Sequence, residues 1–176
     1  IDAIALARVL HVDDVDQAAA IRAARAARDV GVPVTSDIDR LTDRTEELID
    51  AVTIPIFAEH VPTRVTGLND QEEALRRLRR PHHHLLIVTL GEQGAMALDG
   101  DRIHYVPAFH VTAIDTTGAG DVFRAGFIYA LLREWPTEEL LRFANGAAAV
   151  SCTRLGALGG IPALDEVEVL VQSGKV

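Results

Sequence analysis

Cysteine, basic residues and long apolar runs are all scarce in this sequence, and each shortage excludes a class of protein. Cys152 is the single cysteine among 176 residues, so no disulfide bond can form within the chain. A chain without internal disulfides is typical of a reducing cytoplasm, where we expect this protein to act. No apolar stretch approaches the roughly 18 residues that cross a bilayer, so we expect no membrane partner.

The shortage of basic residues argues against a nucleic-acid partner. Seventeen Lys and Arg residues stand against 26 Asp and Glu residues, which gives a formal net charge of −9. A protein that binds nucleic acid irrespective of its sequence needs a basic surface to displace counterions from phosphates. A small anionic ligand remains compatible with this charge, because a nest of backbone N–H groups can hold phosphate inside an acidic protein.

The rest of the composition is that of a globular protein with the length of about one domain. Apolar residues make up 48 % of the chain and charged residues 24 %, a balance that can bury a core. The sequence opens on Ile1, and residues 3–12 already resemble the approach to a buried strand. We therefore expect the chain to be the C-terminal part of a longer polypeptide, without its preceding strands.

Strands and helices are predicted to alternate through the first half of the chain. Short apolar runs that end in polar residues predict strands, and apolar residues at helical spacing predict helices. The clearest strand is the nearly continuous apolar run that a parallel sheet covered on both faces requires. The predicted strands are residues 5–12, 32–37, 51–54 and 85–90, and the predicted helices are residues 16–30, 45–50, 57–65 and 69–79, the last capped by Asn69.

The second half predicts a β-hairpin followed by helices. The hairpin pairs residues 94–98 with residues 102–106 around the turn Asp99-Gly100-Asp101. Helices are predicted at residues 119–133, 137–153 and 164–171. The whole order predicts an α/β layered fold with a mostly parallel sheet flanked by helices.

Residues 115–121, Asp-Thr-Thr-Gly-Ala-Gly-Asp, are the strongest functional signal in the sequence. Three small residues, Gly118, Ala119 and Gly120, precede a predicted helix whose first turn carries Asp121. Without bulky side chains, several backbone N–H groups can converge at the helix N-terminus, where the macrodipole adds about half a positive charge. Such an anion hole suits the charge that develops on a transferring phosphoryl group. The alternative is a glycine-rich turn in which Thr or Asp merely caps a helix.

The chain resembles the ribokinase family of carbohydrate and nucleoside kinases, also called the PfkB family. Residues 115–121 reproduce the C-terminal signature of that family, and residues 89–94, Thr-Leu-Gly-Glu-Gln-Gly, match its Thr-x-Gly-x-x-Gly turn. Residues 142–149 and 153–157 match its last two recognisable segments. The resemblance implies a ribokinase-like fold in which residues 1–176 form the ATP-binding and catalytic part of a single domain. The N-terminal strands and the lid would be absent.

The resemblance also implies a role for each matching residue. Asp121 corresponds to the base that takes the proton from the substrate hydroxyl, and Gly118, Ala119 and Gly120 correspond to the anion hole. Thr89, Gly91 and Gly94 correspond to a turn against the nucleotide phosphates. Asn145 corresponds to a residue that lines the adenine pocket. Taken alone, residues 89–94 would be a strand-to-strand turn, and Asn145 an ordinary polar position on a helix rich in small residues.

A monovalent-cation site, usually for potassium, is a further feature that the resemblance implies. Hard oxygen ligands of the kind expected here suit such an ion. Asp115 could instead brace the turn, and the Cys152 thiol suits a buried small residue better than a reactive group. The implied ligands are the Asp115 carboxylate and the carbonyl groups of Thr117, Cys152, Leu155 and Ala157.

The magnesium region departs from the family pattern. The family commonly has Asn-x-x-Glu before the helix that precedes its Thr-Gly, whereas Ile56 occupies the Asn place here and Glu59 the Glu place. The spacing to Thr66-Gly67 is also longer. Glu59 is therefore the remaining candidate for handling Mg²⁺, and a structural role for it stays open.

Other polar clusters favour structural explanations. Adjacent residues of a regular element cannot all face one ion, so residues 82–84, His-His-His, predict a loop entering a strand. Residues 76–80 carry four arginines that suit the solvated end of a helix. Asp13, Asp14, Asp37 and Asp39 follow predicted strands, where they could reach a ligand or form turns.

The expected function is phosphoryl transfer from MgATP to a hydroxyl group of a small sugar or sugar acid, with potassium as an additional ion. Two alternatives remain open, a nucleoside kinase of the same family and a nucleotide-binding regulator that has lost turnover. The intact Asp121 argues against the regulator. In this family much of the substrate pocket and the lid, which commonly makes homodimer contacts, come from the N-terminal part.

Overall fold

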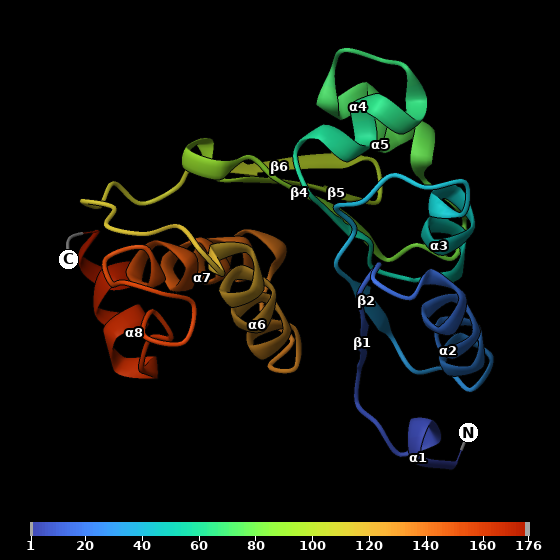
Figure 1. The fold of residues 1–176 in the computed structure, drawn as a ribbon, viewed down its shortest axis with the longest axis horizontal. Helices are drawn as coiled ribbons and strands as arrows, with labels where there is room; N and C mark the ends of the chain where they lie inside the picture. The colour runs from blue at the N-terminus through green and yellow to red at the C-terminus, as the bar shows by residue number, and fades with distance from the viewer. Residues whose placement is uncertain (1, 175–176) are drawn as a thin grey trace. The chain divides into compact units, whose positions relative to one another are not determined.

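The computed structural model describes residues 2–174, and its elements form two compact units (Figure 1). The first unit comprises Ile1–Thr89 and Ala97–Ile103, and the second comprises Leu90–Met96 and His104–Val176. The hairpin of β5 (Ala95–Asp99) and β6 (Arg102–Val106) contributes residues to both units.

The first unit alternates strands with helices, as the sequence predicts. Its elements are α1 (Asp2–Ala5), β1 (Leu10–Val12), α2 (Gln17–Asp29), β2 (Val34–Ser36), α3 (Thr45–Ala51), β3 (Ile56–Phe57), α4 (His60–Thr66), α5 (Gln71–Leu78) and β4 (Leu85–Thr89). Its strands pair in parallel, with Leu10 opposite Val34 and Ile56 opposite Ile87. A parallel bridge between Thr35 and Ile54 links β2 to the stretch before β3. The larger sheet has the strand order β3-β4-β5-β6.

Capping residues mark both ends of α2 in the first unit. The Asp16 carboxylate accepts a hydrogen bond from the Ala19 N–H (2.9 Å) at the start of α2, and Gly31 follows the end of α2 with φ 77°. The buried residues of α2 share one helix face, because each has another three or four positions away; they are Gln17, Ala20, Ile21, Ala24 and Ala27. The helix therefore presents one apolar stripe to the core.

Three details of the first unit differ from the sequence-based expectation. Residues 2–5 form the helix α1 and the strand begins only at Leu10, because apolar pattern alone does not separate a short helix from a strand. The cap of α5 is Asp70, which accepts from the Glu73 N–H (2.8 Å), and not its neighbour Asn69. The strand expected at residues 51–54 is a single bridge at Ile54, and β3 begins at Ile56.

The second unit is built on three helices. They are α6 (Ala119–Leu131), α7 (Thr137–Ser151) and α8 (Leu164–Ser173), with α7 packed against both of the others. A Cβ atom at Gly126 of α6 would lie 3.0 Å from the Cβ of Ala147 and 3.2 Å from the Cα of Ala144. Glycine and alanine at these positions therefore let the α6 and α7 backbones come close together.

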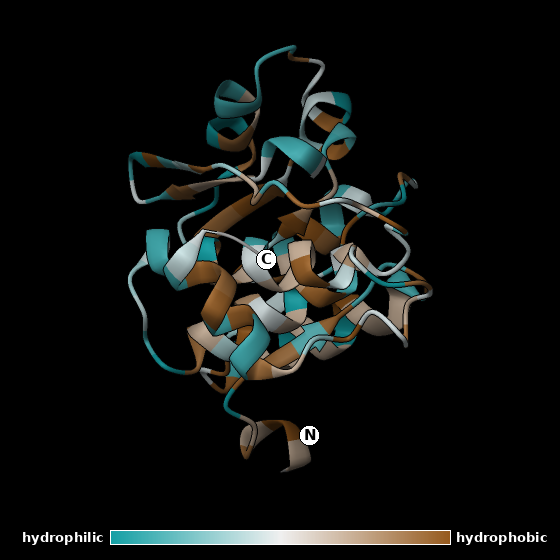
Figure 2. Cartoon of the chain, turned by 90° about the vertical axis from the view of Figure 1, so that its left-hand side faces the viewer, coloured by the Kyte–Doolittle hydropathy of each residue, from teal (hydrophilic) through white to brown (hydrophobic). Residues whose placement is uncertain are grey.

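Apolar and polar residues interleave along the helices of the second unit (Figure 2). This amphipathic pattern is typical of helices that bury one stripe against neighbours and leave the other in water. Among the helices of residues 2–174, none has both the length and the apolar character that crossing a membrane requires.

Candidate active site

The candidate site is centred on the start of α6, where Gly118 turns the chain into the helix. Gly118 has φ 81°, a left-handed conformation that side chains with a Cβ rarely adopt. A Cβ at Gly118 would also lie 2.9 Å from the Cβ of Ala157, so the position lacks both the conformation and the space for a larger residue. The predicted glycine-rich helix start is therefore present.

The first turn of α6 offers backbone N–H groups that the helix itself does not use. The Ala119 N–H donates to the Thr116 carbonyl oxygen (3.1 Å), so this one is already engaged within the turn. Asp121 is exposed in the same turn, and Gly118 and Asp121 both line a pocket of about 460 Å³. The other lining residues are mostly apolar and come from α6, α7, α8 and the loop before α8.

Arg124 lies next to Gly120 at this site, and the sequence analysis did not single it out. Its guanidinium reaches back one turn, and a Cβ at Gly120 would lie 2.6 Å from its Nη1 atom. The side chain is 7 % exposed. Residues four apart share one helix face, so the spacing of Gly120 and Arg124 was the signal that could have identified it.

Asp115 fixes the loop before α6 through three hydrogen bonds. Its Oδ1 atom accepts from the Thr117 N–H (2.9 Å) and the Thr117 hydroxyl (2.7 Å), and its Oδ2 atom accepts from the Gly156 N–H (2.8 Å). These bonds stabilise the ionised form and lower the pKa of Asp115, with the Thr117 hydroxyl as the largest cause. One carboxylate therefore joins the loop to the segment that follows α7.

The end of α7 makes a second connection to the same loop. The Cys152 carbonyl oxygen accepts from the N–H groups of Ile114 (2.7 Å) and Asp115 (3.2 Å). The Cys152 thiol is half-buried, and burial raises its pKa, which agrees with a packing residue and not a reactive thiol. The loop of Asp115 and Thr117 is thus bonded to Cys152 and Gly156, and the set of five cation ligands stays a prediction.

The turn at η1 (Gly91–Gln93) and Asn145 converge on another backbone segment, residues 106–108. At Gly94, which has φ 104°, a Cβ would lie 2.6 Å from the Pro107 carbonyl carbon and 2.6 Å from the Ala108 nitrogen. Asn145 Nδ2 donates to the carbonyl oxygens of Val106 (2.9 Å) and Pro107 (3.2 Å) in the same segment. Asn145 is 5 % exposed.

Two of the predicted site residues belong to the first unit. Thr89 ends β4, and its hydroxyl donates to the Phe57 carbonyl oxygen (3.2 Å). Glu59 is an exposed residue immediately before α4, and its carbonyl oxygen accepts from Gln71 Nε2 (2.6 Å). All the other predicted site residues lie in the second unit.

The comparisons with known proteins agree with the fold. The family model of pfkB family carbohydrate kinases matches residues 1–164. The ribokinase of Haemophilus influenzae is 33 % identical over 149 residues, which cover 82 % of this chain and 49 % of that protein. The ribokinase of Bacillus subtilis is 45 % identical over 86 residues, which cover 49 % of this chain and 29 % of that protein.

A solved structure of similar fold is the Arabidopsis thaliana ribokinase complexed with ribose and ATP. The TM-score is 0.86 at 26 % sequence identity, and the match covers 97 % of this chain and 58 % of that one. The chain therefore spans less than two thirds of the length of these relatives.

Proposed function

Because the chain belongs to the pfkB family of carbohydrate kinases, we propose that it is the ATP-binding and catalytic part of a sugar kinase. In the proposed reaction, a hydroxyl oxygen of a sugar or sugar acid bonds to the γ-phosphorus of ATP. The bond from that phosphorus to the β–γ bridging oxygen breaks, ADP leaves, and the hydroxyl proton passes to Asp121. The solved relative with ribose and ATP supports this class of substrates.

The observation that carries the proposal is the geometry at the start of α6. Gly118 and Asp121 line the same pocket, at a helix N-terminus whose first N–H groups have no partner further along the helix. The helix dipole adds about half a positive charge at this point. A transferring phosphoryl group spreads negative charge over its oxygens, and fixed N–H groups stabilise that charge without reorganising.

Asp121 takes its proposed role from its place beside these N–H groups. A carboxylate is a weak base for an alcohol, but in a loose transition state the hydroxyl loses its proton late. Orienting the hydroxyl toward the phosphorus is then the larger contribution, and accepting its proton completes the step. The nucleotide phosphates would lie against Thr89 and the turn from Gly91 to Gly94.

A potassium ion would fit beside the anion hole. Asp115 Oδ2 accepts one hydrogen bond and has a lone pair left, and carbonyl oxygens of Thr117, Leu155 and Ala157 come from the two joined segments. The Cys152 carbonyl fits less well, because two N–H groups already occupy it. When bound, the ion would add positive charge near the transferring phosphoryl group.

Magnesium would enter with the ATP phosphates. Within residues 2–174, no three His, Cys, Asp or Glu side chains gather into a metal site. Mg²⁺ commonly keeps several waters and takes only one or two protein carboxylates besides the substrate phosphates. A single acidic residue therefore suffices, and Glu59 remains our candidate for it.

Turnover of the full-length protein tests the proposal. Purified protein, MgATP and a panel of ribose, fructose, sugar acids and nucleosides are assayed for ADP release. We expect turnover with a sugar or sugar acid, and we expect Asp121→Asn to lose about 10²–10⁴-fold in kcat while ATP binding stays within threefold. ADP release by Asp121→Asn within a few-fold of wild type would remove Asp121 from the mechanism.

The same panel separates the alternatives. Turnover only with nucleosides would replace the sugar by a nucleoside as the acceptor. ATP binding without turnover on any acceptor would favour a regulator.

A further inference from the structure

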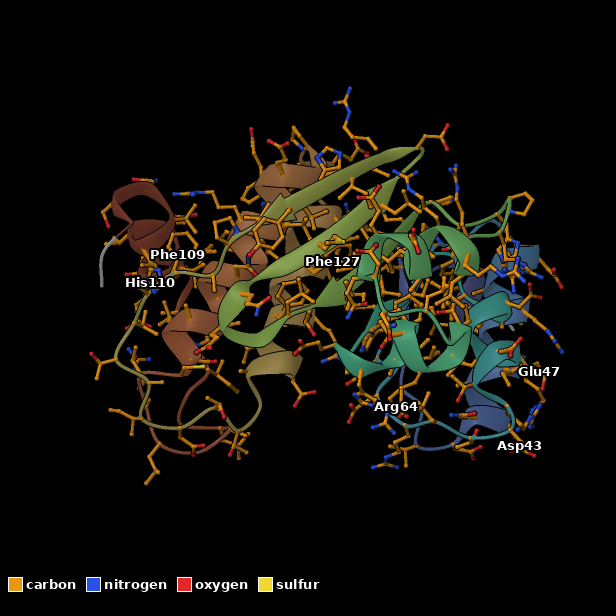
Figure 3. All side chains as sticks on the ribbon, turned by 90° about the horizontal axis from the view of Figure 1, so that it is seen from above. Asp43, Glu47, Arg64, Phe109, His110 and Phe127 are labelled. Carbon is orange, nitrogen blue, oxygen red and sulfur yellow. The ribbon has the colours of Figure 1, made fainter. Side chains whose placement is uncertain are left out.

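One stripe of α7 runs along the chain segment that leads out of β6. Three contacts at helical spacing make this connection. His104 Nδ1 lies 3.2 Å from Glu138 Oε1, the Arg142 guanidinium lies 4.9 Å from the ring centre of Phe109, and Asn145 donates its two bonds between them. Phe109, with its neighbour His110, is labelled on this segment in Figure 3. Segment 104–109 is therefore attached to α7 along its length.

Asn145 is the buried member of this stripe, and the chemistry of β6 explains it. The strand ends at Val106 because Pro107 has no N–H group to continue a ladder. The carbonyl oxygens of Val106 and Pro107 need donors, and both partners of the Asn145 amide are acceptors. The Nδ2 atom must therefore face them, and its two N–H groups are both used.

Segment 104–109 also contacts the turn proposed to hold the nucleotide phosphates. The Tyr105 hydroxyl donates to the Gln93 carbonyl oxygen (2.7 Å), and Gly94 lies directly against Pro107 and Ala108. The turn closes on itself through the Leu90 N–H, which donates to the Gly94 carbonyl oxygen (2.7 Å). Any shift of segment 104–109 would consequently move the turn.

A different face of α7 packs on the helix that carries the anion hole. Ala144 and Ala147 meet Gly126 of α6, and the ring of Phe143 stacks on Tyr129 at 5.1 Å. α7 thus contacts α6 with one face and segment 104–109 with another. Its rigid backbone sets the separation between the phosphate-binding turn and the anion hole.

We propose that Asn145 is a positioning residue for the phosphate-binding turn and does not read the adenine base through its amide nitrogen. This inference rests on the proposed function, because it assigns how that nucleotide site is held. Removing the amide leaves two carbonyl groups without donors and lets segment 104–109 move away from α7. Affinity for the phosphates then falls, whatever base the nucleotide carries.

Binding of ATP and of inorganic tripolyphosphate, which has no base, tests the inference. Both are titrated calorimetrically, with magnesium, into the full-length protein and its variants. We expect Asn145→Ala to weaken both ligands by the same factor, about tenfold, the equivalent of one ordinary hydrogen bond. The matched control Glu139→Gln, an exposed position on the same helix, should change neither affinity.

Tyr105→Phe is an independent test of the same connection. Tyr105 is 52 % exposed, so this variant is expected to fold, and losing its bond to Gln93 should weaken both ligands by a smaller common factor. Weaker binding of ATP alone in Asn145→Ala would show that the residue reads the base and would overturn the inference. Unchanged affinities in both variants would do the same. Wild-type protein that binds neither ligand would overturn the proposed function, and this inference with it.

Discussion

Different interactions stabilise the interior of each of the two units, and this difference suits the second unit to the site that we propose. In the first unit, β2, β3 and β4 are almost wholly buried, and parallel ladders satisfy their backbone groups. In the second unit, the loops around α6 depend on single side chains that bond to backbone, chiefly Asp115 and Asn145. Strands in a buried ladder have few backbone N–H or carbonyl groups left to bind a ligand. Loops that are held in place by side-chain hydrogen bonds can keep their backbone N–H groups exposed to a ligand.

Alanine substitutions at glycines in the left-handed conformation are the most direct test of this difference between the two units. Gly118 precedes α6 and Gly31 follows α2, with φ 81° and 77°. Replacing either by alanine costs about 1 kcal/mol of unfolding free energy from the backbone alone. At Gly118 the new Cβ also meets Ala157, whereas nothing lies within 4 Å at Gly31.

We therefore expect Gly118→Ala to lower kcat by at least about 100-fold, the effect of losing one anion-hole donor. Gly31→Ala should keep the wild-type kcat and lose only the unfolding free energy that comes from the strained backbone conformation. Steady-state assays and urea unfolding of both variants measure these effects. Equal kcat values in the two variants would mean that the α6 start has no special role.

Acid is expected to affect the first unit before the second. His83 is buried before β4; its Nδ1 accepts from the Arg80 N–H (3.1 Å) and its Nε2 bonds to the Ile49 carbonyl oxygen (3.0 Å). Burial lowers the pKa of His83 to about 4. The unfolded chain takes up this proton near the ordinary pKa of about 6.5, so stability is full above that pH. It then falls by about 3 kcal/mol as the pH drops from 6.5 to 4.

His83→Gln isolates this effect, because glutamine does not titrate. The variant should lose about 1 kcal/mol at neutral pH and show a flatter decline toward pH 4, with exposed His84→Gln as the control. Urea unfolding at several pH values gives both slopes. Asp115 has the same sign in a more acidic range: its lowered pKa contributes stability above the unfolded pKa, and this is lost as the pH falls through the lower folded pKa. Parallel slopes in wild type and His83→Gln would contradict the assignment.

Local patterns predicted the elements of both units, and the failures have local causes. The apolar run of β4 and the Gly-Ala-Gly-Asp string at the start of α6 each dictate one structure. Asn69 and Asp70 are both good caps, and nothing in the sequence chooses between them. Pro55 cannot donate to a ladder, which separates the bridge at Ile54 from β3.

The sequence predicted which residues form the candidate site, but it did not predict the long-range hydrogen bonds that hold the surrounding loops in place. The residues at the helix start follow from spacing and from family resemblance. The bonds from Asn145 to Val106 and Pro107 span 39 and 38 residues, and no periodic pattern connects positions so far apart. Such contacts arise only when α7 packs, so sequence analysis could offer a nucleotide role for Asn145 but not its partners.

Potassium dependence should have a moderate effect and should belong to the second unit alone. Asp115 joins the two segments whose oxygens would hold the ion, and a tetraalkylammonium ion, whose charge is shielded by methyl groups, is not expected to replace potassium there. We expect kcat of the full-length protein to be on the order of tenfold higher in potassium chloride than in tetramethylammonium chloride at equal ionic strength. Asp115→Ala should be slow in both salts. Identical wild-type rates in the two salts would eliminate the cation site.

The smallest effect is expected from the ion pair between Arg154 and Glu166, close in sequence to the proposed cation ligands. Glu166 bonds to Arg154 and accepts from the Ala163 N–H (2.8 Å) at the start of α8, and these bonds lower the pKa of Glu166. Both side chains are more than a third exposed, so water and salt screen their attraction. Arg154→Gln should therefore shift the melting temperature by at most a few degrees, less at high salt, and leave kcat unchanged. A large fall in kcat would mean that Arg154 orders the segment of Leu155 and Ala157, and the division between supporting and reacting residues in this unit would have to be redrawn.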